Sequence, residues 1–93
     1  MTRLVVPGSL RQFTDGESGV ELALADGANL SDLLDALTAE KPALARRLRD
    51  EQGELRRYVN IYIDGEDARR AGGLKAAVPA DAEVLVLPSV AGG

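Results

Sequence analysis

The sequence predicts an α+β domain in which a helix packs across a mixed β-sheet to form a roll. Four stretches have the pattern of strands, at residues 3–6, 20–24, 58–63 and 84–87, and a leucine-rich helical stretch lies between the second and the third. This order, strand-strand-helix-strand-strand, is typical of one sheet layer with a helix across it. With 93 residues, the chain has the length of a single domain.

The first two predicted strands are joined by a stretch that is longer than a tight turn. Residues 3–6 form a short apolar run that ends before Pro7, and apolar side chains alternate along residues 20–24. We expect these two strands to pair antiparallel. Leu10 and Phe13 lie in the polar connection between them, where apolar side chains are unexpected. Two interpretations stay open: both residues cover one end of the core, or they form part of a partner surface.

The helix is predicted from leucines that recur at i, i+3, i+4 and i+7, namely Leu30, Leu33, Leu34 and Leu37. Asn29 is a suitable N-cap, and Asp32 follows three residues later near the positive end of the helix dipole. Pro42 either stops this helix or occupies the first position of a second one, in which Leu44 and Leu48 are four residues apart.

Two further strands are predicted in the second half of the chain. Residues 58–63 alternate strictly, with Val59, Ile61 and Ile63 on one face and Tyr58, Asn60 and Tyr62 on the other. Asp64-Gly65 supplies a turn, after which residues 67–69 are expected to form a short return strand. Residues 84–87 form a continuous apolar run, which is typical of a strand buried on both faces. We expect that strand to be central in the sheet, and the two tyrosines to pack rather than to bind a ligand.

The composition excludes several classes of function. The chain has no cysteine and no histidine, so it lacks a thiolate nucleophile, the usual general base near neutral pH and the soft metal ligands. Residues 64–67 are acidic but lack the ligand spacing of an EF-hand, so we expect no metal site and no bound cofactor. Autonomous catalysis is not expected; the chain is predicted not to be an enzyme.

The charge of the chain disfavours polyanionic partners. The net charge is -4, whereas nucleic acids and anionic membranes bind positive surfaces. A neutral or basic protein partner suits this charge better. The arginines occur in three groups interleaved with acidic residues, as on a solvated helical face: Arg46, Arg47 and Arg49; Arg56 and Arg57; Arg69 and Arg70. No apolar run approaches the ~18–20 residues that cross a bilayer, so we expect a cytoplasmic protein.

The end of the chain carries the most specific signal. Pro88 cannot donate a ladder hydrogen bond and is expected to end the last strand, so domain 1–88 is followed by a flexible Gly-Gly tail, residues 89–93, that reaches ~16 Å when extended. Glycine has no Cβ, so Gly92 and Gly93 could thread a narrow channel and present the terminal carboxylate to another protein's active site. A frayed end without function is the alternative.

The chain resembles the ThiS/MoaD-type sulfur carriers of the β-grasp, ubiquitin-like fold. The resemblance covers the whole chain, and three segments carry it: Leu87-Pro88-Ser89-Val90-Ala91-Gly92-Gly93; Gly73-Leu74; and Pro7 followed by Leu10-Arg11-Gln12-Phe13. The segment from Arg57 to Arg69 is most similar to the cysteine-biosynthesis carriers of that family. One departure is Ala82-Glu83, where many relatives have Gly-Asp before the last strand.

The resemblance implies a mechanism in which partners perform the catalysis. An E1-like adenylyltransferase would use ATP and magnesium to activate the carboxylate of Gly93, which would then become a thiocarboxylate. The sulfur would pass to an activated serine derivative on a PLP-dependent synthase, and a metalloprotease would release the cysteine formed on Gly93. Gly92 would give backbone access, while Pro88, Ser89, Val90 and Ala91 would anchor the tail in partner channels.

Three alternatives remain open at this point. The same tail would serve a sulfur donor for molybdopterin, thiamin or thiosugar biosynthesis. A covalent protein modifier of the ubiquitin type would transfer Gly93 to lysine amines. An interaction module would make no use of the Gly-Gly end. The sequence names neither the sulfur source nor the acceptor enzyme.

Overall fold

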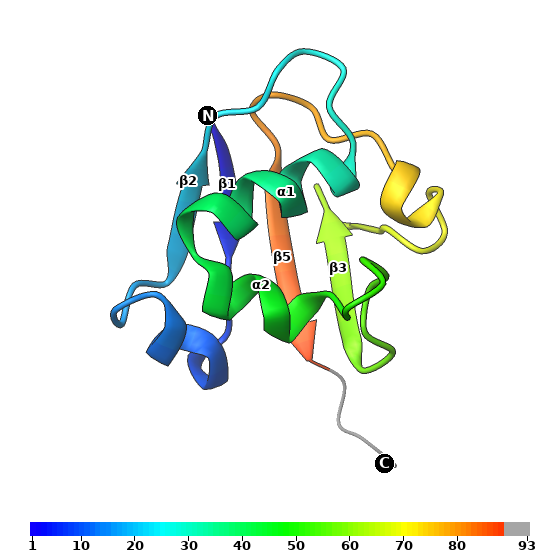
Figure 1. Cartoon of the computed structure of the whole chain (residues 1–93). Coiled ribbons are helices and arrows are strands. Elements are labelled where there is room, and N and C mark those ends of the chain that lie inside the picture. The colour runs from blue at the N-terminus through cyan, green and yellow to red at the C-terminus, as the bar shows by residue number, and fades with distance from the viewer. Residues whose placement is uncertain (89–93) are drawn as a thin grey trace.

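The computed structural model describes residues 1–88, and residues 89–93, the predicted tail, lie outside the described residues. Within residues 1–88, a five-stranded sheet is covered on one face by two helices (Figure 1). The strands are β1 (Thr2–Val5), β2 (Gly19–Leu22), β3 (Val59–Ile63), β4 (Glu66–Asp67) and β5 (Glu83–Pro88). The helices are α1 (Leu30–Glu40) and α2 (Pro42–Leu48), with short 3-10 helices η1 (Gly8–Phe13) and η2 (Gly73–Lys75).

The sheet is mixed, and β5 is its central strand, as predicted. The strand order is β2-β1-β5-β3-β4. β1 pairs antiparallel with β2, which confirms the predicted pairing, and parallel with β5, while β3 pairs antiparallel with β5. This arrangement confirms the predicted α+β roll of the ubiquitin-like, β-grasp type.

Both helices begin where the sequence predicts. The Asn29 side-chain oxygen accepts from the backbone N–H of Asp32, and an Asp32 carboxylate oxygen accepts from the backbone N–H of Asn29, each at 2.9 Å. This capping box satisfies two of the donors that a helix start leaves open. Pro42 is the first residue of α2, so the second of the two interpretations of this proline is correct. The leucines of both helices are fully buried against the sheet: Leu30, Leu33, Leu34, Leu37, Leu44 and Leu48.

The prediction that the last strand is buried on both faces is wrong. Val84 and Val86 are fully buried, but Leu85 is only partly buried and Leu87 is 40% exposed. The helices cover one face of the sheet, so the alternate side chains of β5 lie on the open face. The continuous apolar run therefore predicted a central strand correctly. It did not predict that one face of this strand would be left uncovered.

The return strand also differs from the prediction, because it is Glu66–Asp67 rather than residues 67–69. Asp64 (φ 49°) and Gly65 (φ 86°) both adopt left-handed conformations, as in a two-residue type I′ hairpin turn. Glu66 is consequently placed directly opposite Ile63. An Asp67 carboxylate oxygen then accepts from the backbone N–H of Arg69 at 2.9 Å, where the chain leaves the sheet.

Candidate functional site

The candidate site is the edge of the molecule at which β5 ends. β1 pairs with β5 only from Glu83 to Leu85, whereas β3 accompanies it to the last described residue, with Val59 opposite Pro88. Leu87 and Pro88 are both exposed. The last described residue of the central strand therefore lies at one edge of the sheet, beside the start of β3 and below α2 (Figure 1).

Of the residues predicted to bind partners through the tail, the structure describes Pro88 alone. Pro88 is placed, at the end of β5. Ser89, Val90, Ala91, Gly92 and Gly93 lie outside the described residues. Their roles in partner binding and in carrying the reactive carboxylate therefore stay predictions.

Leu10 and Phe13 lie in η1, not in an irregular loop. The backbone N–H of Leu10 donates to the carbonyl of Pro7 at 3.0 Å, in the first turn of this 3-10 helix. Both side chains are half-buried and pack against the core cluster, so they do cover one end of the core. Their contact with a partner stays a prediction.

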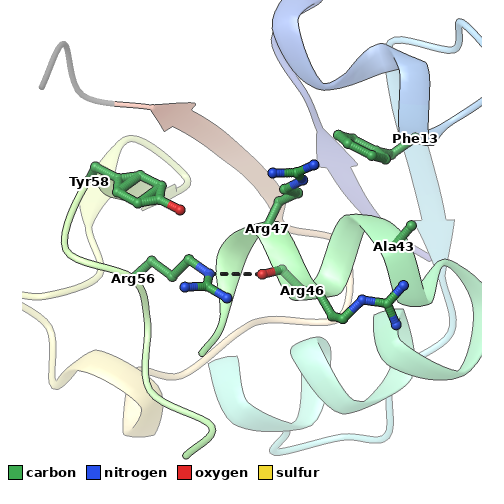
Figure 2. A pocket seen from close by; sticks show the side chains of 6 residues that line it. All are labelled: Phe13, Ala43, Arg46, Arg47, Arg56 and Tyr58. Carbon is green, nitrogen blue, oxygen red and sulfur yellow. Dashed lines mark hydrogen bonds between the residues drawn. The ribbon is translucent and has the colours of Figure 1, made fainter. Parts of the chain in front are cut away.

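An open pocket of about 350 Å³ lies at the same end of the molecule (Figure 2). It is lined by Phe13, Ala43, Arg46, Arg47, Arg56 and Tyr58. The Arg47 guanidinium stacks on the Phe13 ring, 4.9 Å from the centroid, and the Nε–H of Arg56 donates to the carbonyl of Arg46 at 2.8 Å. η1, α2 and the segment before β3 thus meet around one basic hollow.

Sequence reasoning missed this pocket. Tyr58 was expected within a strand, on one face with Tyr62, but it precedes β3 and is 45% exposed. The arginine pairs were visible, yet helical periodicity does not reveal that the segment before β3 folds back onto the C-terminal turn of α2. The sequence feature that could have indicated the pocket is the repeat of an arginine pair ten residues later, Arg46-Arg47 and Arg56-Arg57.

The prediction of a solvated arginine face holds for only some of the arginines. Arg46 and Arg47 are exposed on α2. Arg49, in contrast, donates to the carbonyl of Gly53 at 2.9 Å and pairs with Asp35 at 2.8 Å. Arg69 donates to the carbonyls of Val59 and Arg56, at 2.6 and 2.8 Å. These last two arginines fasten loop backbone to the helices and to β3.

Residues 1–88 hold no helix that is long and apolar enough to cross a bilayer. In the same part of the chain, no three acidic side chains gather as metal ligands would. The buried side-chain polar atoms of these residues all have hydrogen-bond partners, for example Thr2, whose hydroxyl donates to the carbonyl of Ala80 at 2.8 Å. The described core therefore gives no sign of an internal polar site.

The model of the ThiS family matches residues 4–93. The chain belongs to the ThiS family. Two curated relatives are similar over most of their length. The sulfur carrier protein CysO of Mycobacterium tuberculosis is 39% identical over 95% of this chain and 94% of its own. Small archaeal modifier protein 3 of Haloferax volcanii is 35% identical over 84% of each chain.

Solved structures of the family share the fold closely. A chain in the crystal structure of the BexX/CysO complex of Amycolatopsis orientalis matches with a TM-score of 0.86 and 34% identity, over 100% of both chains. The predicted resemblance to the ThiS/MoaD-type carriers, and within them to CysO, is thereby confirmed.

Proposed function

We propose that the chain is a sulfur carrier whose reactive group is the terminal carboxylate of Gly93. Membership of the ThiS family and the similarity to proteins named as sulfur carriers support this function. The single structural observation that carries it is the course of β5. The described part of this central strand ends at Pro88, which is exposed, lies beside the start of β3 and stands five residues before Gly93 in the sequence.

The proposed chemistry begins with activation, because a carboxylate is ionised at neutral pH and does not react with nucleophiles. A carboxylate oxygen of Gly93 attacks the α-phosphorus of ATP, and pyrophosphate leaves. Hydrosulfide then attacks the acyl carbon of the adenylate, the C–O bond breaks and AMP leaves, and loss of the S–H proton gives the thiocarboxylate. An E1-like adenylyltransferase binds the ATP and magnesium and catalyses these steps. This chain has neither cysteine nor histidine, so the catalytic groups come from the partner.

The anchored strand and the small tail residues suit this chemistry together. β5 is hydrogen-bonded on both sides over its first half, so the partner enzyme can bind a rigid body and receive the tail from a fixed origin. Gly92 adds no side chain beside the reacting carbon, so the carboxylate can enter a narrow channel. Binding of the body thereby helps to orient the carboxylate for reaction.

We further propose cysteine biosynthesis as the pathway, on the basis of the similarity to CysO. The thiocarboxylate sulfur would displace the leaving group of an activated serine derivative held by a PLP-dependent synthase. The product would be cysteine attached to Gly93, which a metalloprotease would release. Sulfur donation to molybdopterin, thiamin or thiosugar biosynthesis is the alternative within the same chemistry.

The acceptor assignment is tested by a transfer experiment. The chain is first thiocarboxylated and then mixed with the PLP-dependent synthase and O-phosphoserine or O-acetylserine, and the intact mass is followed. Addition of one cysteine residue to the chain supports the proposal. A thiocarboxylate that persists in the presence of this synthase, but is consumed by a thiazole or molybdopterin synthase, contradicts it.

A second function, covalent modification of proteins, is favoured by one specific observation. Two of the relatives are named as small archaeal modifier proteins. An activated Gly93 would then be transferred to a lysine amine rather than to sulfur. Isopeptide-linked adducts of an N-terminally tagged chain in cell extract, absent when Gly92 and Gly93 are deleted, would demonstrate it. Identical adduct patterns for the full and the deleted chain would exclude it.

A further inference from the structure

The basic pocket adjoins Pro88, the last described residue of the central strand. Tyr58 lines the pocket, and the next residue, Val59, lies opposite Pro88 in the sheet. Figure 2 shows the end of β5 running past Tyr58 at the rim of the pocket. An enzyme that binds residues 89–93 has this pocket beside the point from which they continue, so the pocket is within reach of its surface.

The charge of the pocket is opposite to that of the whole chain. The chain has a net charge of -4, yet three arginines and no acidic residue line the pocket. The ion pairs seen among residues 1–88 involve other cations: Arg3, Lys41, Arg49 and the N-terminal ammonium. The neighbouring carboxylate of Asp50 accepts the backbone N–H groups of Gln52 and Glu54. The positive charge of the pocket is thus not offset by an ion pair within the described part of the chain.

Two of the three arginine side chains of the pocket, those of Arg47 and Arg56, are held in place by contacts within the chain. Arg47 rests on the Phe13 ring, with its guanidinium 4.9 Å from the centroid. Arg56 is fixed through Nε to the carbonyl of Arg46, which leaves its terminal nitrogens available (Figure 2). Guanidinium groups bind carboxylates with two parallel hydrogen bonds, and less side-chain entropy is lost when they are already ordered.

We propose that this pocket docks an acidic surface segment of the enzyme that activates Gly93. The inference rests on the proposed function. It assigns this pocket as the surface that binds the activating enzyme, and every version of the sulfur-carrier chemistry requires such an enzyme. A polyanion such as nucleic acid suits the site less well, since it would extend beyond the pocket over a chain of net negative charge. An Asp- or Glu-bearing protein segment needs only the local positive charge.

The test compares two double charge reversals that change the net charge equally. Arg46→Glu with Arg47→Glu reverses the pocket charge, because three positive groups become one positive and two negative, and Arg70→Glu with Lys75→Glu is the control at exposed residues outside the pocket. For each chain, the KM and kcat of ATP-dependent thiocarboxylation by the activating enzyme are measured at low and at high salt. Arg46→Gln with Arg47→Gln repeats the test if thermal melting shows that the reversal to glutamate perturbs the fold.

We expect the pocket reversal to raise the KM for the chain about tenfold with kcat unchanged, because exposed charges act mainly on association. The control is expected to stay within about twofold. High salt should raise the KM of the unmodified chain, because it screens an attraction, and should lower that of the pocket variant, because it screens a repulsion. Equal KM values for the pocket variant and its control would overturn the docking site while leaving the sulfur carrier function in place.

A second measurement does not depend on activation. Amide shifts of the 15N-labelled chain are followed on addition of a hexaglutamate peptide, with ATP and a short oligodeoxynucleotide as competing probes. Shifts confined to η1, α2 and the residues around Tyr58, caused by the peptide and lost in the pocket variant, support the docking site. If ATP or the oligonucleotide binds there more tightly than the peptide, the pocket is an anion or nucleic-acid site and the proposal fails.

If the enzyme never activates the unmodified chain, the proposed function fails, and this titration still decides whether the pocket binds carboxylates.

Discussion

The two halves of β5 differ in what surrounds them. From Glu83 to Leu85 the strand lies between β1 and β3, and Val84 is fully buried beneath the helices. At Leu87 and Pro88 only β3 remains alongside, and both residues are exposed. The first half and the fully buried Val86 therefore hold the fold together, whereas the exposed Leu87 and Pro88 lie at the surface, next to the predicted tail in the sequence. Substitutions at the two ends should separate stability from activity.

The largest expected effect is on activity, from changes to the tail. Gly92→Phe, or one residue added after Gly93, should reduce thiocarboxylation at least 100-fold, because a side chain or an extra peptide unit keeps the carboxylate from the reacting position. The free energy of unfolding should stay within about 0.5 kcal/mol of the unmodified value. Activation rates and urea unfolding of the same samples provide the check, with Gly92→Ala as the milder control. Full activation of both variants would show that the tail does not enter a narrow channel.

The next effect compares adjacent residues of β5 on opposite faces of the sheet. Val86 is fully buried, so Val86→Ala should lower the free energy of unfolding by about 2 kcal/mol through lost packing. Leu87 is 40% exposed, so Leu87→Ala should cost about 0.5 kcal/mol or less. Urea denaturation of the two variants measures both values. Equal losses would mean that the open face of the sheet is as important for folding as the covered one.

A smaller effect is expected at the start of β3, the strand that supports the end of β5. Arg69 donates to the carbonyls of Val59 and Arg56 and to the side-chain oxygen of Asn60. Arg69→Ala should cost about 1–2 kcal/mol, because charged donors make the stronger hydrogen bonds. Arg70→Ala, one residue along and exposed, is the matched control and should change stability by less than about 0.5 kcal/mol. A similar loss in both variants would remove the fastening role assigned to Arg69.

The smallest effect on stability is expected at the start of α1, which lies away from the end of β5. Asn29→Ala removes the capping box of α1 and should cost about 1 kcal/mol of stability. Thiocarboxylation per folded molecule should not change, because the start of α1 lies away from the end of β5 (Figure 1). Thermal melting and activation rates test both parts, and a changed KM for this variant would contradict the separation.

The fold was largely predictable because its strongest signals are local. The leucine repeat and the Asn29 cap specify α1, strict alternation specifies β3, and Asp64-Gly65 specifies a tight hairpin turn. Local patterns do not say which face of a sheet a helix covers, and for that reason the exposure of Leu87 was missed. Nor do they show hydrogen bonds between distant segments, such as the one from Arg56 to Arg46 that shapes the pocket.

The site itself was predictable only in its chemistry. The Gly-Gly end and the lack of cysteine and histidine are properties of the sequence and point to a carboxylate activated by partners. The position of Pro88 relative to the basic pocket depends on its pairing with Val59, which is a property of the folded sheet. Tertiary pairing thus decides which surface accompanies the reactive end.

The most direct test of the central claim is the mass of the C-terminal peptide after activation. The chain is incubated with an E1-like adenylyltransferase, ATP, magnesium and sulfide and then digested with trypsin, which releases residues 76–93 intact because no lysine or arginine follows Lys75. The account predicts that one oxygen is replaced by sulfur in this peptide and that fragmentation places the change at Gly93. An unchanged mass with several activating enzymes, or a change located in any other peptide, would contradict it.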